Sequence, residues 1–277
     1  MRAARSVLFL PASNPRAVEK ARTLPCDMAI LDLEDAVAPE AKAEARAAAV
    51  EAIRAGGFEP RLGVRINGLD TPWGEADLEA LAEAGAGLIV APKVDSAEAV
   101  RALAGRLPDG SALWAMIESP AALLNLPAIA GAGGPLEALM LGVNDLAVGL
   151  GTGVAPDREA LKPWLAATVA AARAHGLTAI DGVYNDFADV EGFAAECAQA
   201  RLYGFDSKSL IHPSQIAPAN AAFTPSEEEV ARARAVVAAF AAPEATGRGA
   251  IRVEGRMVER LHLAAAERLL ARLDPRV

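Results

Sequence analysis

The stretch MAILDLED at residues 28–35 joins an apolar run to a cluster of carboxylates. A short continuous apolar run is typical of a strand that is covered on both faces, as in a parallel sheet. Asp32, Glu34 and Asp35 stand where this strand would end. In barrels of parallel strands, catalytic groups lie at the carboxyl ends of the strands. The stretch therefore predicts a buried strand that delivers acids to a functional site.

The same pattern recurs along the chain. Helical patterns, at residues 39–55, 77–84, 96–106, 162–175 and 186–200, separate the apolar runs. This alternation predicts an α/β fold, a TIM (β/α)8 barrel, over residues 1–225. A doubly wound sheet is the alternative, but no GxGxxG motif follows the first apolar run. The predicted strands cover residues 6–11, 28–33, 62–67, 87–93, 112–118, 138–143, 177–181 and 204–211.

Residues 226–277 do not continue the alternation and are predicted to form a helical extension. Residues 226–241 predict a helix, with Ser226 as the N-cap and Glu229 completing a capping box. Residues 242–249 contain Pro and Gly and predict a flexible segment. Residues 257–273 predict an amphipathic helix whose apolar face is formed by Leu261, Ala265, Leu269 and Leu273.

Composition excludes several classes of function. The 277-residue chain has a net charge of −9, which makes binding to nucleic acid or to an anionic membrane surface unfavourable. No segment approaches the ~18 uninterrupted apolar residues of a membrane span. Cys26 and Cys197 lie far apart and form no CxxC motif, so neither a zinc site nor a disulfide framework is expected. A reducing cytoplasmic location is the simplest expectation.

Charged side chains stand at the ends of further predicted strands. Arg65, Lys93, Glu118 and Asp145 follow the third to sixth apolar runs, whereas the chain has only three histidines. Carboxylates without soft ligands favour a hard cation such as Mg²⁺. The planar fork of Arg65 suits a carboxylate. Together these groups suit a 2-oxo or 2-hydroxy acid whose oxygens the metal chelates.

These motifs resemble those of the citrate lyase β-subunit-like family of the aldolase/citrate lyase superfamily. The resemblance implies a Mg²⁺-dependent carbon–carbon lyase that works as a homotrimer or hexamer. Such enzymes cleave a β-hydroxyacyl-CoA, such as malyl-, citramalyl- or citryl-CoA, into a 2-oxo acid and an acyl-CoA, or form it from these two. The motifs are RSVLFLP (5–11), ILDLEDAV (30–37), VRIN (64–67), PK (92–93), ES (118–119), GVNDL (142–146) and GFDSKSLIHP (204–213).

The resemblance also implies roles for single residues. Glu118 and Asp145 would bind the metal, with Glu118 close to the substrate. Arg65 would hold the oxo-acid carboxylate and the developing oxyanion. The remaining strand-end groups, Asp32, Glu34, Asp35 and Lys93, would orient these ligands and Arg65. From the residues alone, the acids can equally be helix caps or ion-pair partners, and Arg65 can be a structural partner of Glu34.

One position departs from the family pattern. Lyases for malyl and citramalyl thioesters carry a Met-Ile/Val-Asp motif whose aspartate is the acid/base group in a neighbouring subunit's site. Here the segment reads Met257-Val258-Glu259, so the acid is one methylene longer. We expect Glu259 to be catalytic on a lid, with an ordinary surface acid as the alternative. Two other functions remain open, namely a citrate lyase β-subunit using an acyl-carrier-protein thioester and a non-catalytic protein that binds oxo acids.

Overall fold

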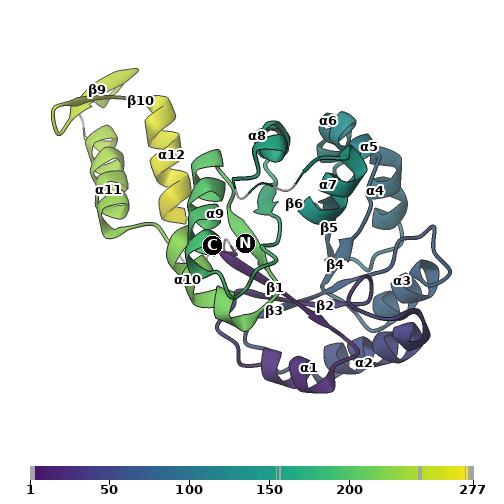
Figure 1. Cartoon of the computed structure of the whole chain (residues 1–277). Coiled ribbons are helices and arrows are strands. Elements are labelled where there is room, and N and C mark those ends of the chain that lie inside the picture. Colours follow the sequence, from purple (N-terminus) through teal and green to yellow (C-terminus); the bar gives the residue numbers. More distant parts are fainter. Residues whose placement is uncertain (1–3, 154, 156, 243–244, 272, 274–277) are drawn as a thin grey trace. The chain divides into compact units, whose positions relative to one another are not determined.

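The computed structural model describes residues 4–153, 155, 157–242, 245–271 and 273 of the chain (Figure 1). The chain divides into two compact units. One spans Ala4–Phe223, and the other includes the chain from Thr224 onward. No helix in the described ranges has the length and apolar character that crossing a bilayer requires.

The first unit is a closed barrel, as the sequence predicts. Within its described residues, eight strands pair in parallel with their neighbours in sequence, and the last pairs with the first. This closure excludes the open doubly wound sheet. Asp32 pairs with Arg65 in the strand register, so their side chains leave the barrel at the same level. The strands are β1 (Ser6–Pro11), β2 (Met28–Asp32), β3 (Arg61–Arg65), β4 (Leu88–Ala91), β5 (Ala112–Ile117), β6 (Leu136–Leu141), β7 (Thr178–Asp181) and β8 (Ser207–Leu210).

Two apolar clusters hold the barrel together, because alternate residues of each strand point to opposite faces. The smaller cluster includes Val7, Ile30, Trp114 and Met140, which come from alternate strand positions. The larger one joins the other strand faces to the surrounding helices. The apolar runs are therefore continuous because both of their faces are buried.

Ten α-helices of the described chain belong to the barrel unit. Five of them, α1, α5, α6, α7 and α10, are not among the helices predicted above. The N-terminus of α1 has a clear signal, because Asn14 accepts a hydrogen bond from the Ala17 N–H and Pro15 follows it. The helices are α1 (Pro15–Ala21), α2 (Lys42–Ala55), α3 (Gly74–Glu83), α4 (Ala97–Ala104), α5 (Pro120–Leu124), α6 (Leu126–Ala130), α7 (Val143–Leu150), α8 (Lys162–Ala174), α9 (Val190–Tyr203) and α10 (Ile216–Phe223).

The second unit corrects one prediction of secondary structure. Helix α11 (Glu227–Ala241) begins at the predicted Ser226 cap with its Glu229 capping box. Strands β9 (Ala250–Val253) and β10 (Arg256–Glu259) then form an antiparallel hairpin, so residues 257–259 are not helical. The turn is made by Glu254 and Gly255, both with positive φ, which suits a two-residue hairpin connection. Residues 243 and 244 of the predicted flexible segment lie outside the described residues.

The predicted apolar face of the last helix is right at Leu269, which packs in the cluster with α11, and wrong at Leu261. Helix α12 (Arg260–Ala271) packs in a cluster with α11 through Leu263, Ala266 and Leu270, at helical spacing. Leu261, which the sequence places on the buried face, is 62% exposed. The local sequence pattern of α12 does not show where α11 lies. The position of α11 therefore decides which side of α12 is buried.

Candidate active site

A cavity of about 350 Å³ lies at the carboxyl ends of the barrel strands. It brings together five of the residues that the sequence predicts, which come from β2, its following loop, β3, the position directly after β5, and α7. Two more, Glu34 and Lys93, contact members of this group, as described below. The five predicted residues that line the cavity are Asp32, Asp35, Arg65, Glu118 and Asp145.

Arg65 is held by carboxylates on its own side of the barrel. Its Nε and Nη2 donate to the two oxygens of Asp32 at 2.7 and 2.6 Å. Its Nη1 forms ion pairs with Glu34 at 3.0 Å and with Asp35 at 3.6 Å. These acids raise the pKa of Arg65 against the effect of burial. The guanidinium is therefore a fixed, permanently charged group at the wall of the cavity.

Asp32 is itself fixed by the backbone. It accepts hydrogen bonds from the N–H groups of Glu34 and Ala36 at 2.9 and 3.2 Å. Lys42 donates to the carbonyls of Leu33 and Glu34, which holds the same loop from its other side. Asp32, at the end of β2, and the two acids that follow it thus contact Arg65 directly.

The two carboxylate oxygens of Glu118 differ, because one accepts a hydrogen bond and the other has no hydrogen-bond partner in the described chain. Its Oε1 accepts a hydrogen bond from the Lys93 backbone N–H at 2.6 Å. Lys93 has a positive φ of 52°, unusual for a non-glycine residue, and its Nζ pairs with Glu34 at 3.2 Å. The buried Oε2 of Glu118 has no hydrogen-bond partner in the described chain. A Cβ at Gly142 would stand 2.4 Å from this oxygen, so only glycine leaves it room.

Burial and neighbouring acids make the charged form of Glu118 unfavourable. Burial, followed by the nearby charge of Glu34, raises its pKa from 4.5 to about 8. Asp145 also raises it, since the two carboxylates are close enough to repel each other. Asp145 lies in the first turn of α7 and not directly at the end of a strand, because β6 ends at Leu141.

These residues fit a hard divalent cation. Glu118 and Asp145 offer carboxylate oxygens to one cavity, and one of those oxygens is buried without a partner. No three His, Cys, Asp or Glu side chains gather into a larger metal-binding group within the described ranges. Mg²⁺ commonly uses one or two protein carboxylates and takes its other ligands from water and substrate. The donor set therefore suits Mg²⁺ and leaves coordination positions for a substrate.

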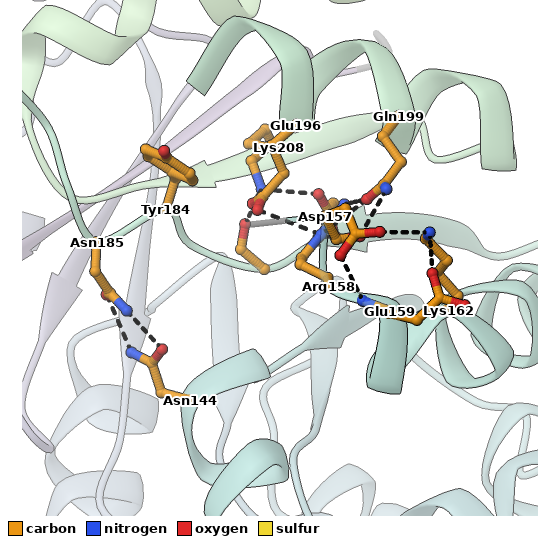
Figure 2. A network of polar contacts seen from close by, with 12 residues as sticks. Asn144, Asp157, Arg158, Glu159, Lys162, Tyr184, Asn185, Glu196, Gln199 and Lys208 are labelled. Atoms are coloured by element: carbon orange, nitrogen blue, oxygen red, sulfur yellow. Dashed lines mark hydrogen bonds and ion pairs between the residues drawn. The ribbon is translucent and has the colours of Figure 1, made fainter. Parts of the chain in front are cut away.

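A buried ionic network of two cations and two acids lies on the faces of β7 and β8 that point away from the cavity. It was not predicted from the sequence. Lys208 donates to Asp181 and Glu196, each at 2.7 Å, and Arg158 pairs with the same two acids (Figure 2). Two cations thus balance two acids in a buried position. Lys208 is the fifth residue of the motif GFDSKSLIHP, and only the tertiary structure supplies its partners.

Asn144 and Asn185 were also missed as site residues. They exchange two side-chain hydrogen bonds, at 2.8 and 3.2 Å (Figure 2). Both line the cavity, and the pair joins helix α7, which carries Asp145, to the loop after β7. Met116 contacts Arg65 through its sulfur at 3.9 Å. The alternation of side chains along each barrel strand is the only sequence signal for Met116.

Glu259 belongs to the second unit and ends β10. Its backbone N–H donates to His262 Nδ1 at 3.0 Å, a contact within the hairpin and helix α12. Its side chain is partly exposed. The predicted catalytic role of Glu259 stays a prediction.

Comparison with known proteins identifies the family. The family description HpcH/HpaI aldolase/citrate lyase matches residues 5–213, most of the chain. The chain belongs to this family. Among solved structures, a CitE protein of Mycobacterium tuberculosis in complex with magnesium, acetoacetate and coenzyme A superposes with a TM-score of 0.80 at 36% identity. The match covers 98% of this chain and 99% of that one, which confirms the resemblance to citrate lyase β-subunits.

Curated relatives divide between two reactions. A (3S)-malyl-CoA thioesterase of Cereibacter sphaeroides is 48% identical over 98% of this chain and 94% of its own length. An L-malyl-CoA/β-methylmalyl-CoA lyase of the same species is 39% identical over 95% of this chain and 92% of its own length. Both names contain malyl-CoA, whereas the bond that reacts differs between them.

Replacement of Glu118 by Gln tests its place as a metal ligand. A folded-state pKa of about 8 means that the metal-free fold loses stability as pH rises from about 4.5 to 8, by up to ~1.4 kcal/mol per pH unit. Glu118→Gln cannot ionise, so its metal-free melting temperature should exceed the parent's at pH 8. Mg²⁺ should raise the melting temperature of the parent and not that of the variant. The exposed Glu40→Gln is the matched control, and an unchanged Mg²⁺ response in Glu118→Gln would exclude this ligand.

Proposed function

We propose that this protein is a Mg²⁺-dependent enzyme that acts on a malyl-type CoA thioester and hydrolyses it to the hydroxy acid and free CoA. The observation that carries this proposal is that Arg65, Glu118 and Asp145 line one and the same cavity. The malyl-CoA relatives and the coenzyme A complex of the CitE structure support the substrate class. The 48% identity to a thioesterase, against 39% to a lyase, favours hydrolysis.

Different residues would bind different parts of the substrate. Glu118 and Asp145 would hold Mg²⁺, which supplies positive charge to the carboxylate and hydroxyl oxygens of the hydroxy acid. Arg65 would donate to the thioester oxygen, where negative charge grows in the reaction. Because Asp32 already orients Arg65 bidentately, little reorganisation is needed when that charge appears.

Hydrolysis needs one acid/base group near the thioester. A carboxylate takes a proton from water, whose oxygen attacks the thioester carbon. The carbon–sulfur bond then breaks, and the CoA sulfur leaves with a proton. We assign the carboxylate to Glu259 of a neighbouring copy, because Glu259 stands where the lyase pattern has its acid/base aspartate. The proposal thus includes a homo-oligomer, a trimer or hexamer in keeping with the sequence-based expectation, in a reducing compartment such as the cytoplasm.

Carbon–carbon cleavage is the second candidate function, supported by the lyase relatives. Here the carboxylate removes the proton of the substrate hydroxyl. The bond between the hydroxyl-bearing carbon and its neighbour breaks, releasing a 2-oxo acid and the enolate of the acyl-CoA, which is then protonated. Arg65 would stabilise charge on the same thioester oxygen in both reactions. Only the target of the acid/base group differs, and Glu259 stands where the lyase pattern has an aspartate.

Product analysis separates the candidates. Incubation of the parent protein with (3S)-malyl-CoA and Mg²⁺ should yield malate and free CoA, measured by liquid chromatography and mass spectrometry. Glyoxylate and acetyl-CoA in equal amounts would establish cleavage instead. Asp145→Asn keeps the side-chain shape and removes a charge, so turnover should collapse while the fold survives. Normal turnover by that variant in EDTA would rule out the metal mechanism.

Arg65→Lys tests the oxyanion role. Lysine keeps the charge and loses the fork that Asp32 orients. We expect kcat to fall by ~10²–10³-fold, as when one oxyanion-hole donor is removed. Circular dichroism should show an intact fold. A rise in KM with kcat unchanged would place Arg65 in uniform substrate binding.

Glu259→Gln should nearly abolish turnover, whereas Glu254→Gln, the matched change in the same hairpin, should leave it intact. Glu259→Asp restores the residue of the lyase pattern and should shift products towards glyoxylate and acetyl-CoA. If Glu259 acts on a neighbouring copy, co-expression of Glu259→Gln with Asp145→Asn should recover about a quarter of the parent activity, since random pairing leaves that share of sites whole. Parent-like turnover in Glu259→Gln would make it an ordinary surface acid.

A further inference from the structure

Ser209 carries a buried hydroxyl at the wall of the cavity. The residue is 2% exposed, and its Oγ has no hydrogen-bond partner among the residues that the structure describes. It lines the same cavity as Arg65, Glu118 and Asp145. An unpaired buried hydroxyl is unfavourable, so a polar group at this position calls for a partner.

The cavity wall around Ser209 is apolar on the side of β1, whereas Asn185 lines the cavity after the other neighbouring strand, β7. The neighbouring strand β1 contributes Phe9, and Ile211 follows β8, so this part of the wall is largely apolar. β8 is separated from β5, the strand before Glu118, by β6 and β7 in one direction and by β1–β4 in the other. Ser209 and Glu118 therefore approach the cavity from different sides of the barrel.

We infer that Ser209 is a substrate-contact residue whose hydroxyl donates a hydrogen bond to an oxygen of the bound acid, away from the metal-binding carboxylates. This inference rests on the proposed function, in which the cavity takes a 2-oxo or 2-hydroxy acid. Such an acid carries several oxygens, and Arg65 is assigned to the thioester oxygen. The hydroxyl of Ser209 supplies a partner for one of them.

Ser207 provides a matched control on the same strand. It lies two residues earlier and so faces the same side of β8. Its Oγ is also buried without a partner, but Ser207 does not line the cavity. The two serines thus share chemistry, burial and strand, and differ in access to a ligand.

Titration calorimetry with glyoxylate and with pyruvate, each with saturating Mg²⁺, tests the inference. Ser209→Ala should weaken binding of the acid by roughly tenfold to a hundredfold, the range for a hydrogen bond to a charged group. Affinity for Mg²⁺ alone should not change. Ser209→Thr, which keeps the hydroxyl, should restore much of the acid affinity, and Ser207→Ala should bind like the parent.

Stability distinguishes a ligand contact from a structural one. Because its Oγ has no protein partner, Ser209→Ala should not lower the melting temperature of the ligand-free protein, but it should reduce the stabilisation by Mg²⁺ with glyoxylate. The inference is wrong if Ser209→Ala binds both acids like the parent, or if the parent binds neither. Ser209-dependent acid binding without turnover of malyl-CoA would instead remove the proposed function and leave the inference intact.

Discussion

The site depends on the bidentate pair between Arg65 and Asp32. Parallel pairing of β2 with β3 sets these residues side by side, and two hydrogen bonds below 2.8 Å fix the guanidinium. The same guanidinium pairs with Glu34, which pairs with Lys93, whose backbone N–H holds Glu118. One chain of contacts therefore crosses β2, β3, β4 and β5. Its end is Glu118, whose buried Oε2 has no hydrogen-bond partner in the described chain.

An excess of negative charge gives this series of contacts its chemistry. Asp32, Glu34, Asp35, Glu118 and Asp145 gather around three cations, Arg65, Lys93 and Lys42. The excess of acid is relieved at Glu118, whose pKa burial and Glu34 raise to about 8. A divalent cation beside Glu118 would remove the same excess at neutral pH without protonation. In the proposal, this excess of acid is what favours binding of the cation.

The fold explains how relatives at 48% and 39% identity can carry names with different reactions. Hydrolysis and carbon–carbon cleavage both develop charge on a thioester oxygen, so a preorganised guanidinium assists either one. The proton is taken from water in one reaction and from the substrate hydroxyl in the other. A barrel that binds and polarises the substrate can therefore be combined with a different acid/base group. In the proposal, that group is Glu259, on the hairpin and helix of the second unit.

The sequence by itself determined the barrel and the strand-end acids. Apolar runs such as MAILD require burial on both faces, and helices between them leave a closed parallel sheet as the compact arrangement. Local signals also predicted the Ser226 cap, whereas short helices such as α5 and α6, of five residues each, carry too few turns for a clear pattern. Tertiary structure alone decided the contacts of Arg65, the unpartnered oxygen of Glu118 and the access of Ser209 to the cavity. It also decided which side of α12 is buried. These features arise where residues far apart in the chain meet, and periodicity describes only the face of each element, not the group that lies opposite it.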